Sequence, residues 1–325
     1  NIFAILAYLP VEFATELLNL RSMFGTKVIE SIAPIAGGFW GEVTATVDWC
    51  EPNYEWSQYV AEPMNTVSNL SFVVMGLIGA SHEYMQRSRK IFMYMYLTVA
   101  SIGFGSMAFH GTLTLLGQEF DELPMVWFIL GLIAVQMQDT VIIPSYKITT
   151  TTLTILYAMI YSVCHIYFRF VQVFQIHFAL QIITMVITGF FQFRNIHYSE
   201  KNGYLEMDDK VKNVVTLTVT SLLIGFAFWM IDYHGCEYFA TMRKNNVWHV
   251  NPHGHVLWHL FMGYSAFCLV CSFRVMDCLR SVKDFKVEYW YGLPLVYRAV
   301  NKNDDNTAAD EKKEYQSKFY SCGKL

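Results

Sequence analysis

Seven long apolar stretches constrain the fold of this chain more than any other feature of its sequence. The hydrocarbon core of a bilayer is about 30 Å thick, so a helix that crosses it needs about 20 mostly apolar residues. Charged residues make up only 15% of the chain, against about 25% in soluble domains. We therefore predict an all-α membrane protein, a seven-transmembrane helix bundle. The predicted spans are residues 64–82, 92–112, 121–138, 151–168, 173–193, 213–231 and 254–273.

The basic residues of the loops indicate how this bundle is oriented. An odd number of spans places the two ends of the chain on opposite sides of the membrane, and short cytosolic loops carry an excess of Lys and Arg. Most basic loop residues, among them Arg87, Arg89 and Lys90, fall on the side of the C-terminus. We predict a cytosolic C-terminus and a lumenal N-terminus. The net charge of −4, with no basic stripe between aromatic residues, gives no indication of nucleic-acid binding.

The apolar stretches divide the chain into four parts. They are an N-terminal extension that is interfacial or disordered (1–47), an acidic segment (48–63), the seven-helix domain (64–273) and a cytosolic C-terminal segment (274–325). The last part contains an aromatic stretch at 288–297, which we expect at the membrane interface, and a charged tail.

Polar residues inside the spans gather at the predicted lumenal end of three helices. Ser106 and His110 are four residues apart, as are His255 and His259, so each pair shares one helix face. Asp121 opens the third span. Ionisable groups within a membrane are costly and mark function by default. The sequence therefore predicts a site of three imidazoles, a carboxylate and a hydroxyl at one depth.

A second histidine pair with the same spacing competes with this assignment. His249 and His253 are also four residues apart, but Pro252 lies between them and would disrupt a helical turn through both. Asn251 as N-cap and Pro252 as first helical residue instead begin a helix that contains the later pair. By the same reasoning, Pro124 fits the first turn of the third span.

Three neutral imidazoles with one open position are the ligand set of a catalytic zinc, which lowers the pKa of bound water to about 7. We predict zinc ligands at His110, His255 and His259. Asp121 would accept the proton of the attacking water and return it to a leaving group, and Ser106 would donate to a developing oxyanion. The alternatives are a histidine pair that only packs or hydrogen-bonds, and a Ser106 hydroxyl bonded back to its own helix.

An acidic, aromatic segment precedes the first span. Hard oxygen ligands at irregular spacing suit Ca²⁺, whereas a solvated acidic linker whose carboxylates favour the next helix N-terminus explains them equally well. Its oxygen-bearing side chains are Asp48, Glu51, Asn53, Glu55 and Glu62.

Two cysteines fall on the predicted lumenal, oxidising side of the membrane. Cys50 precedes the first span, and Cys236 lies between the sixth and the seventh. Disulfides form in such compartments, but the sequence does not give the distance between the two residues. A disulfide and two free thiols at the membrane edge both remain open.

Three motifs resemble those of one known family. "DWCEPNYEWSQYVAEPMNTVSNL", "GSMAFHGTLTLLGQEFDELPM" and "HGHVLWHLFMGY", in this order around seven spans, resemble the alkaline ceramidases over about residues 46 to 298. The resemblance implies an intramembrane zinc amidase that hydrolyses ceramide to sphingosine and a fatty acid and is activated by calcium. It also implies a location in the endoplasmic reticulum or Golgi and membrane lipids as partners.

Carried over residue by residue, the resemblance implies zinc at the three histidines, with Asp121 and Ser106 beside the attacking water. It also implies a disulfide between Cys50 and Cys236. The calcium ligands that it implies are Asp48, Trp49 through its carbonyl, Glu51, Asn53 and Glu62, with Glu55 outside the shell.

Two other classes of protein remain as alternatives. The predicted zinc arrangement also resembles that of seven-helix receptors of the adiponectin or progestin type. A protein of that class would show little hydrolysis. The acidic segment and the predicted lumenal N-terminus argue against that class. A purely structural membrane protein with a hydrogen-bonded His–Asp network would hold no stoichiometric zinc.

Overall fold

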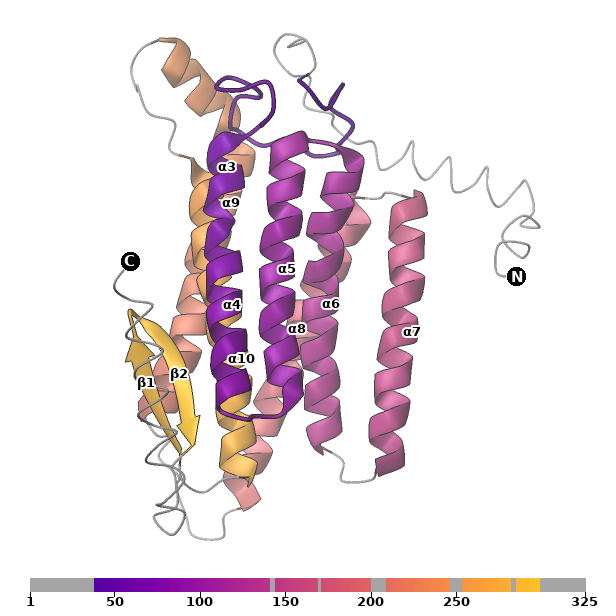
Figure 1. Cartoon of the computed structure of the whole chain (residues 1–325), viewed down its shortest axis with the longest axis vertical. Helices are drawn as coiled ribbons and strands as arrows, with labels where there is room; N and C mark the ends of the chain where they lie inside the picture. Colours follow the sequence, from indigo (N-terminus) through magenta and orange to yellow (C-terminus); the bar gives the residue numbers. More distant parts are fainter. Residues whose placement is uncertain are drawn as a thin grey trace, which may run out of the picture.

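The computed structural model describes residues 38–140, 144–168, 171–199, 209–245, 253–281 and 285–298. Within these residues the chain forms long helices that run up and down one bundle (Figure 1). The first span is broken at Asn69 into two helices, and each later span is one helix. Their bounds are α3 Pro63–Ser68, α4 Leu70–Met85, α5 Lys90–Thr112, α6 Leu115–Thr140, α7 Pro144–Phe168, α8 Val171–Ser199, α9 Asp209–Lys244 and α10 Gly254–Ser281.

The helices are long and apolar enough for a membrane protein. Among the described residues, six segments meet both the length and the hydropathy expected of a membrane span. The apolar part of α8, Val173–Gly189, is shorter. An integral membrane protein with a helical bundle is therefore confirmed, and helices cover all seven predicted windows.

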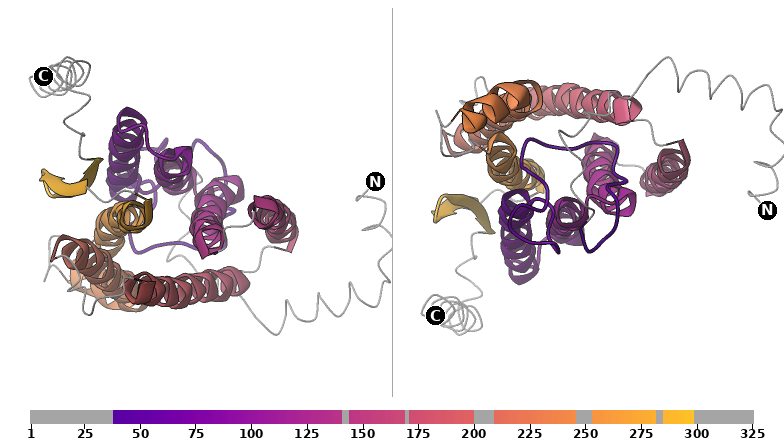
Figure 2. Two further views of the ribbon diagram at one scale, coloured as in Figure 1. Left: turned by 90° about the horizontal axis from the view of Figure 1, so that it is seen from below. Right: turned by 90° about the horizontal axis from the view of Figure 1, so that it is seen from above.

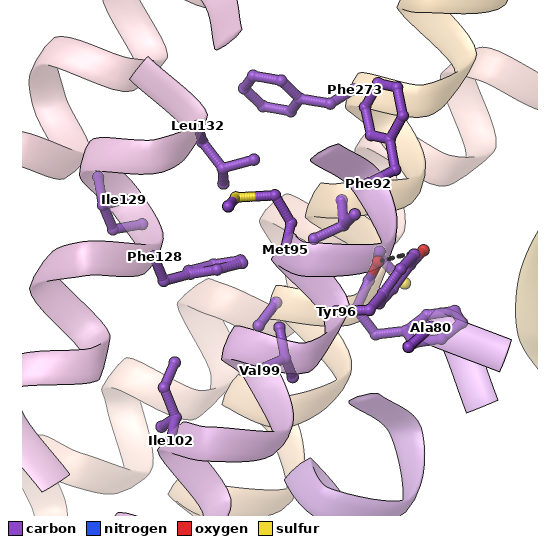
Figure 3. Packing of buried hydrophobic residues seen from close by; sticks show 14 of the residues in the cluster. Ala80, Phe92, Met95, Tyr96, Val99, Ile102, Phe128, Ile129, Leu132 and Phe273 are labelled. Atoms are coloured by element: carbon purple, nitrogen blue, oxygen red, sulfur yellow. Dashed lines mark hydrogen bonds between the residues drawn. The ribbon is translucent and has the colours of Figure 1, made fainter. Parts of the chain in front are cut away.

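Close approach of small residues organises the centre of the bundle. Seen end-on, α5 lies between α4 and α6, while α7 stands at the outer edge beside α6 (Figure 2). A Cβ added to Gly76 would lie 2.5 Å from the backbone nitrogen of Ala100, so only glycine permits this α4–α5 distance. In a bilayer such contacts drive helix association, because lipid is as apolar as the side chains. Phe92, Tyr96 and Leu132 are among the buried side chains that fill the core of the bundle (Figure 3).

The chain turns sharply between α5 and α6, and α6 begins earlier than predicted. Leu113 ends α5 in the left-handed conformation, with a φ of 47°. The Thr44 hydroxyl accepts the Leu115 N–H at 2.9 Å and supports the start of α6. Asp121 therefore lies in the second turn, and Pro124 lies inside the helix instead of in its first turn. The prediction missed this start because the first six residues of α6, "LLGQEF", are less apolar than a span.

Two further boundaries differ from the prediction. The last helix begins at Gly254, two residues after Pro252, while Asn251 and Pro252 themselves lie outside the described residues. Its preceding residue, His253, has a φ of 42° and is not helical. At its other end α10 continues to Ser281, beyond the predicted limit of 273.

A β-hairpin follows the last helix, where only an interfacial aromatic stretch was predicted. Strands β1 (Phe285–Trp290) and β2 (Leu293–Arg298) pair antiparallel. Tyr291 and Gly292 both have positive φ, 46° and 84°, which is the conformation of a two-residue type I′ turn. The hairpin packs on α10, where Tyr264 donates to the Gly292 carbonyl at 2.8 Å.

Part of the predicted N-terminal extension is packed against the bundle. The backbone N–H groups of Thr44 and Ala45 donate to the Leu113 carbonyl at 3.1 and 3.0 Å. The Thr46 N–H donates to the Gln118 side chain at 2.8 Å. Residues 1–37 and the charged tail from 299 onward lie outside the described residues.

Candidate metal centre and acidic segment

Three histidines from two helices meet at one end of the bundle. Their ligand nitrogens all lie within 4.8 Å of one another. His110 ends the last full turn of α5, and His255 and His259 occupy successive turns of α10. All three are buried, with exposed fractions of 0, 4 and 3%. Among the described residues this is the one such group of three His, Cys, Asp or Glu side chains.

Neighbouring side chains orient two of the three imidazoles. His110 Nδ1 contacts the carboxylate of Glu62, which precedes α3. His259 Nδ1 lies 2.7 Å from the Ser68 hydroxyl at the end of α3. Metal-bound histidines almost always use the second ring nitrogen in this way. The remaining ring nitrogen of His110, Nε2, has no hydrogen-bond partner, and that of His259 lies 3.5 Å from the Asn69 amide nitrogen.

The histidine group fits a zinc ion. His110 Nε2 and His255 Nδ1 are buried without a hydrogen-bond partner, which is costly unless something else binds them. The His255 ring also stacks on Trp49, with centroids 3.7 Å apart. Three imidazoles and no fourth protein ligand are typical of a catalytic zinc with an open position.

Ser106 and Asp121 form a hydrogen-bonded pair beside the histidine group. Ser106 lies one turn before His110 on α5, and its side chain hydrogen-bonds to Asp121 of α6. Asp121 itself does not belong to the group of nitrogens within 4.8 Å.

Gly105 is what allows α6 to approach α5 at this point. A Cβ added there would lie 1.8 Å from the Phe120 carbonyl oxygen. Pro124 has no N–H to offer this carbonyl within α6, because a proline interrupts the i→i−4 ladder. The Phe120 carbonyl therefore faces α5 instead, and Asp121 follows it directly.

The acidic segment folds over the histidine end of the bundle. The Asn53 amide donates to both carboxylate oxygens of Asp48 at 3.1 Å. Glu62 accepts the Trp49 N–H at 3.3 Å. Glu51 accepts the N–H groups of Met64 and Asn65, both at 2.8 Å, and so caps the N-terminus of α3. Glu55 is exposed.

The carboxylates of this segment lie close enough to repel one another and so raise one another's pKa. Burial and, to a smaller extent, the negative charge of Glu62 raise the pKa of Asp48 to about 6. Burial also raises the pKa of Glu62. Asn53 Oδ1 is buried without a partner. Asp48, Glu51 and Glu62 do not form a group as tight as that of the three histidines.

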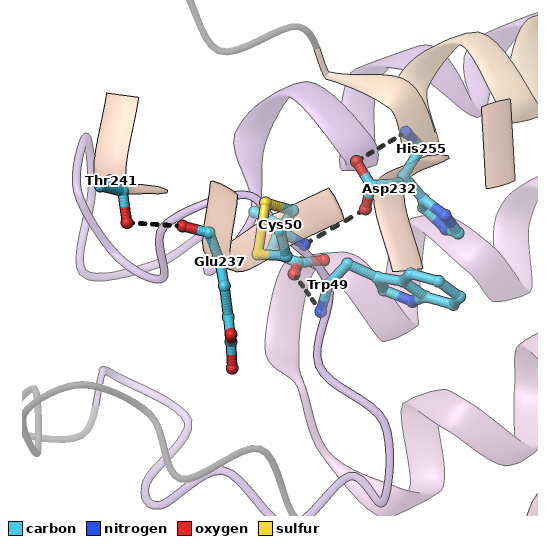
Figure 4. Close-up of a disulfide and its surroundings, with 8 residues drawn as sticks. Trp49, Cys50, Asp232, Glu237, Thr241 and His255 are labelled. Carbon is cyan, nitrogen blue, oxygen red and sulfur yellow. Dashed lines mark hydrogen bonds between the residues drawn. A yellow bond between two sulfur atoms is a disulfide. The ribbon is translucent and has the colours of Figure 1, made fainter. Parts of the chain in front are cut away.

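A disulfide joins the acidic segment to α9, as the resemblance implied. Cys50 and Cys236 are bonded, with their Cα atoms 5.2 Å apart (Figure 4). The bond closes a loop over a sequence separation of 186 residues. It lies at the same end of the bundle as the histidine group.

Sequence reasoning missed three polar residues of this region. Ser68 and Asn69 lie at the break between α3 and α4, and both contact His259. Asp232 of α9 accepts the backbone N–H groups of Cys50 and His255. Asp232 could have been found by the rule that selected Asp121, since it is an ionisable residue one position beyond the predicted span 213–231.

Comparisons with known proteins agree with this architecture. The model of the ceramidase family matches residues 41–297. An alkaline ceramidase of Arabidopsis thaliana is 31% identical over 267 residues, which cover 81% of this chain and 96% of the relative. Alkaline ceramidase YPC1 of Saccharomyces cerevisiae is 27% identical, over 72% of this chain and 77% of its own length. Mouse alkaline ceramidase 3 is also 27% identical, over 79% and 92%.

A helical membrane protein with a buried three-histidine centre is the class that fold and site define. Within that class, the chain belongs to the ceramidase family, whose members are hydrolytic enzymes. The resemblance stated from the three motifs is confirmed.

Proposed function

We propose that this protein hydrolyses the amide bond of ceramide within the membrane, releasing sphingosine and a free fatty acid, with zinc at the histidine centre and activation by calcium. The single observation that carries the proposal is the buried group of His110, His255 and His259 in a chain of the ceramidase family. A lipid amide reaches such a site by lateral diffusion, with its alkyl chains among apolar helices.

A zinc ion at this centre would provide Lewis-acid catalysis. Held by the three imidazoles, zinc would act as a Lewis acid for the amide carbonyl and lower the pKa of a water molecule to about 7. Glu62 and Ser68 would keep His110 and His259 in the tautomer that presents Nε2 to the metal.

Asp121 would transfer protons, and Ser106 would stabilise the developing negative charge. Asp121 would accept a proton from the attacking water and pass it to the sphingoid nitrogen as the amide bond breaks. Ser106 has one O–H, which the ionised Asp121 attracts while the two are hydrogen-bonded. Once Asp121 is protonated, this O–H is free to donate to the negative charge on the former carbonyl oxygen. The pair would thus couple proton uptake to oxyanion stabilisation.

Calcium would bind the acidic segment through Asp48, Trp49, Glu51, Asn53 and Glu62. Glu62 would then serve both centres, because its carboxylate contacts His110 and also accepts the Trp49 N–H. Neutralising the repulsion between Asp48 and Glu62 would fix the segment above the histidines. This arrangement supports activation by calcium without a direct role in the chemistry.

The disulfide supports the orientation that we propose, with the metal centre and N-terminal side lumenal and the C-terminus cytosolic. Cys50–Cys236 requires an oxidising compartment such as the endoplasmic reticulum or Golgi. The basic residues Arg87 and Arg89 lie between α4 and α5, and Lys90 opens α5, at the end of the bundle opposite the disulfide.

Purified protein in detergent with lipid tests the proposal directly. Free sphingosine is measured from ceramide, with calcium added or chelated and a His259→Ala variant as control. We expect release by the natural chain, more with calcium, and none by the variant. Stoichiometric zinc with no release from any ceramide would instead favour the receptor-like alternative.

A further inference from the structure

Asp232 is a buried carboxylate that the proposed chemistry does not use. Its exposed fraction is 3%, and it lies on α9, one turn before Cys236. Its two oxygens are both occupied: Oδ2 accepts the Cys50 N–H at 3.3 Å, and Oδ1 accepts the His255 N–H at 3.2 Å (Figure 4). It also accepts the Gly254 N–H. One side chain therefore joins α9, the acidic segment and the first turn of α10.

The first turn of α10 depends on an acceptor from outside the helix. The first four N–H groups of a helix have no partner within it, and here they belong to the turn that contains His255. A carboxylate at this position also interacts favourably with the positive end of the helix dipole. Gly254 makes the contact close, because a Cβ added there would lie 3.1 Å from Asp232 Cβ and 3.0 Å from the Phe228 carbonyl.

We propose that Asp232 is a positioning residue of the metal centre, which fixes the backbone of His255 and couples it to the disulfide-closed segment. This inference rests on the proposed zinc centre. Cys50 is the residue next to Trp49, whose ring stacks on His255. Through its two oxygens, Asp232 thus holds both the ligand and the aromatic ring that covers it. Its loss leaves three ligands present but one of them badly placed.

The test compares Asp232→Asn with a matched variant at the other end of α10. Asparagine keeps the volume, but its amide offers one oxygen where the structure needs two acceptors. Asp277→Asn removes a carboxylate that is similarly buried, at 6% exposure, and accepts from Arg274 and Arg89. Asp277 lies 22 residues beyond His255 on the same helix, a distance of about 33 Å. Any general weakening of the bundle should appear in both variants.

Two readouts separate positioning from stability. Zinc affinity, measured by competition with a chelator, should fall about 10-fold or more in Asp232→Asn, as it does when metal ligands lose their supporting contacts, and should stay unchanged in Asp277→Asn. In metal-free protein, amide hydrogen exchange of residues 254–257 should speed up only in Asp232→Asn. Equal zinc affinity in both variants, or equal exchange, would overturn the proposal.

The coupling to the disulfide has its own test. If Asp232 acts by joining the two segments, its effect on zinc affinity should shrink when the Cys50→Ser/Cys236→Ser pair has already freed the acidic segment. Strict additivity would overturn the coupling and leave a helix cap alone. Neither readout needs ceramide turnover, so a chain that binds zinc but hydrolyses no ceramide would refute the proposed function without affecting this result.

Discussion

Buried polar side chains lie at both ends of α10, but those at one end are histidines and those at the other are paired charges. At one end, His255 and His259 share a space with His110, and ring nitrogens of this group have no protein partner. At the other, Arg274 is fully buried but contacts Glu83 at 3.1 Å and Asp277 at 2.9 Å. Arg89 also contacts Asp277 at 2.7 Å. Two cations and two anions thus balance there, although Arg274 Nη2 keeps no partner.

The comparison shows how a functional group of buried polar side chains can be distinguished from one that only stabilises the bundle. Buried charges that neutralise one another tie α4, α5 and α10 together, and breaking the set costs stability. The three histidines, by contrast, cannot neutralise one another, and ring nitrogens of His110 and His255 have no protein partner. Such a group needs an external ligand. Burial alone does not distinguish the two ends, since Arg274, Glu83 and Asp277 are almost as fully enclosed as the three histidines.

The largest effect is expected at the histidine end. His110→Ala, His255→Ala and His259→Ala should each lose bound zinc and all measurable hydrolysis, because two imidazoles cannot hold a catalytic zinc. Asp121→Asn should keep zinc and lose turnover. Metal analysis and sphingosine release on the same samples check both statements. Full zinc in any of the three histidine variants would remove that residue from the ligand set.

At the opposite end, Arg274→Met should lower the free energy of unfolding by about 3–5 kcal/mol, because it leaves the buried Glu83 carboxylate without its cation and Asp277 with Arg89 alone. Thermal unfolding in detergent measures the loss. Zinc content per folded protein should not change. A variant that unfolds like the natural chain but has lost its zinc would reverse the roles assigned to the two ends.

The third prediction concerns the close contact between Gly105 of α5 and the Phe120 carbonyl of α6. Gly105→Ala places a Cβ against the Phe120 carbonyl, which cannot move without displacing Asp121. Turnover should fall about 100-fold, since a shift of about 1 Å at a catalytic group costs that much. Gly131→Ala is the matched control on α6, because its Cβ would meet only the flexible end of Met95 at 2.8 Å. Equal turnover in the two variants would contradict the placement of Asp121.

The smallest effect is expected in the acidic segment. Asn53→Ala should raise the calcium concentration needed for half-maximal activity, because it removes an oxygen ligand, and should leave zinc in place. Glu55→Ala, an exposed carboxylate of the same segment, should leave the calcium titration unchanged. If both variants respond alike, the segment is a general acidic surface. If neither responds, it is a linker.

Hydropathy and helical spacing were sufficient to predict the spans and the three histidines. The spacing of His255 and His259 places both on one helix face in any helical structure. The supporting contacts could not be predicted in this way: Ser68 and His259 are 191 positions apart, and Cys50 and Asp232 are 182 apart. Such pairs depend on how α3, α9 and α10 pack, which no local pattern contains.

Local patterns also failed where polar residues continue a helix. The start of α6 at Leu115 was missed, because a span was expected to begin where the sequence becomes continuously apolar. The hairpin after α10 was missed for a different reason. Its turn is Tyr291–Gly292, whereas two-residue hairpin turns favour Asn, Asp or Gly before the glycine, and the aromatic residues around it were interpreted as interfacial.

The central claim is that the three histidines hold the metal that hydrolyses ceramide. The most direct test strips the purified protein of metal and titrates zinc back while sphingosine release is measured. The account predicts that release rises in proportion to zinc and reaches its plateau at one zinc per chain. Full release without zinc, or one tightly bound zinc per chain with no release, would contradict it.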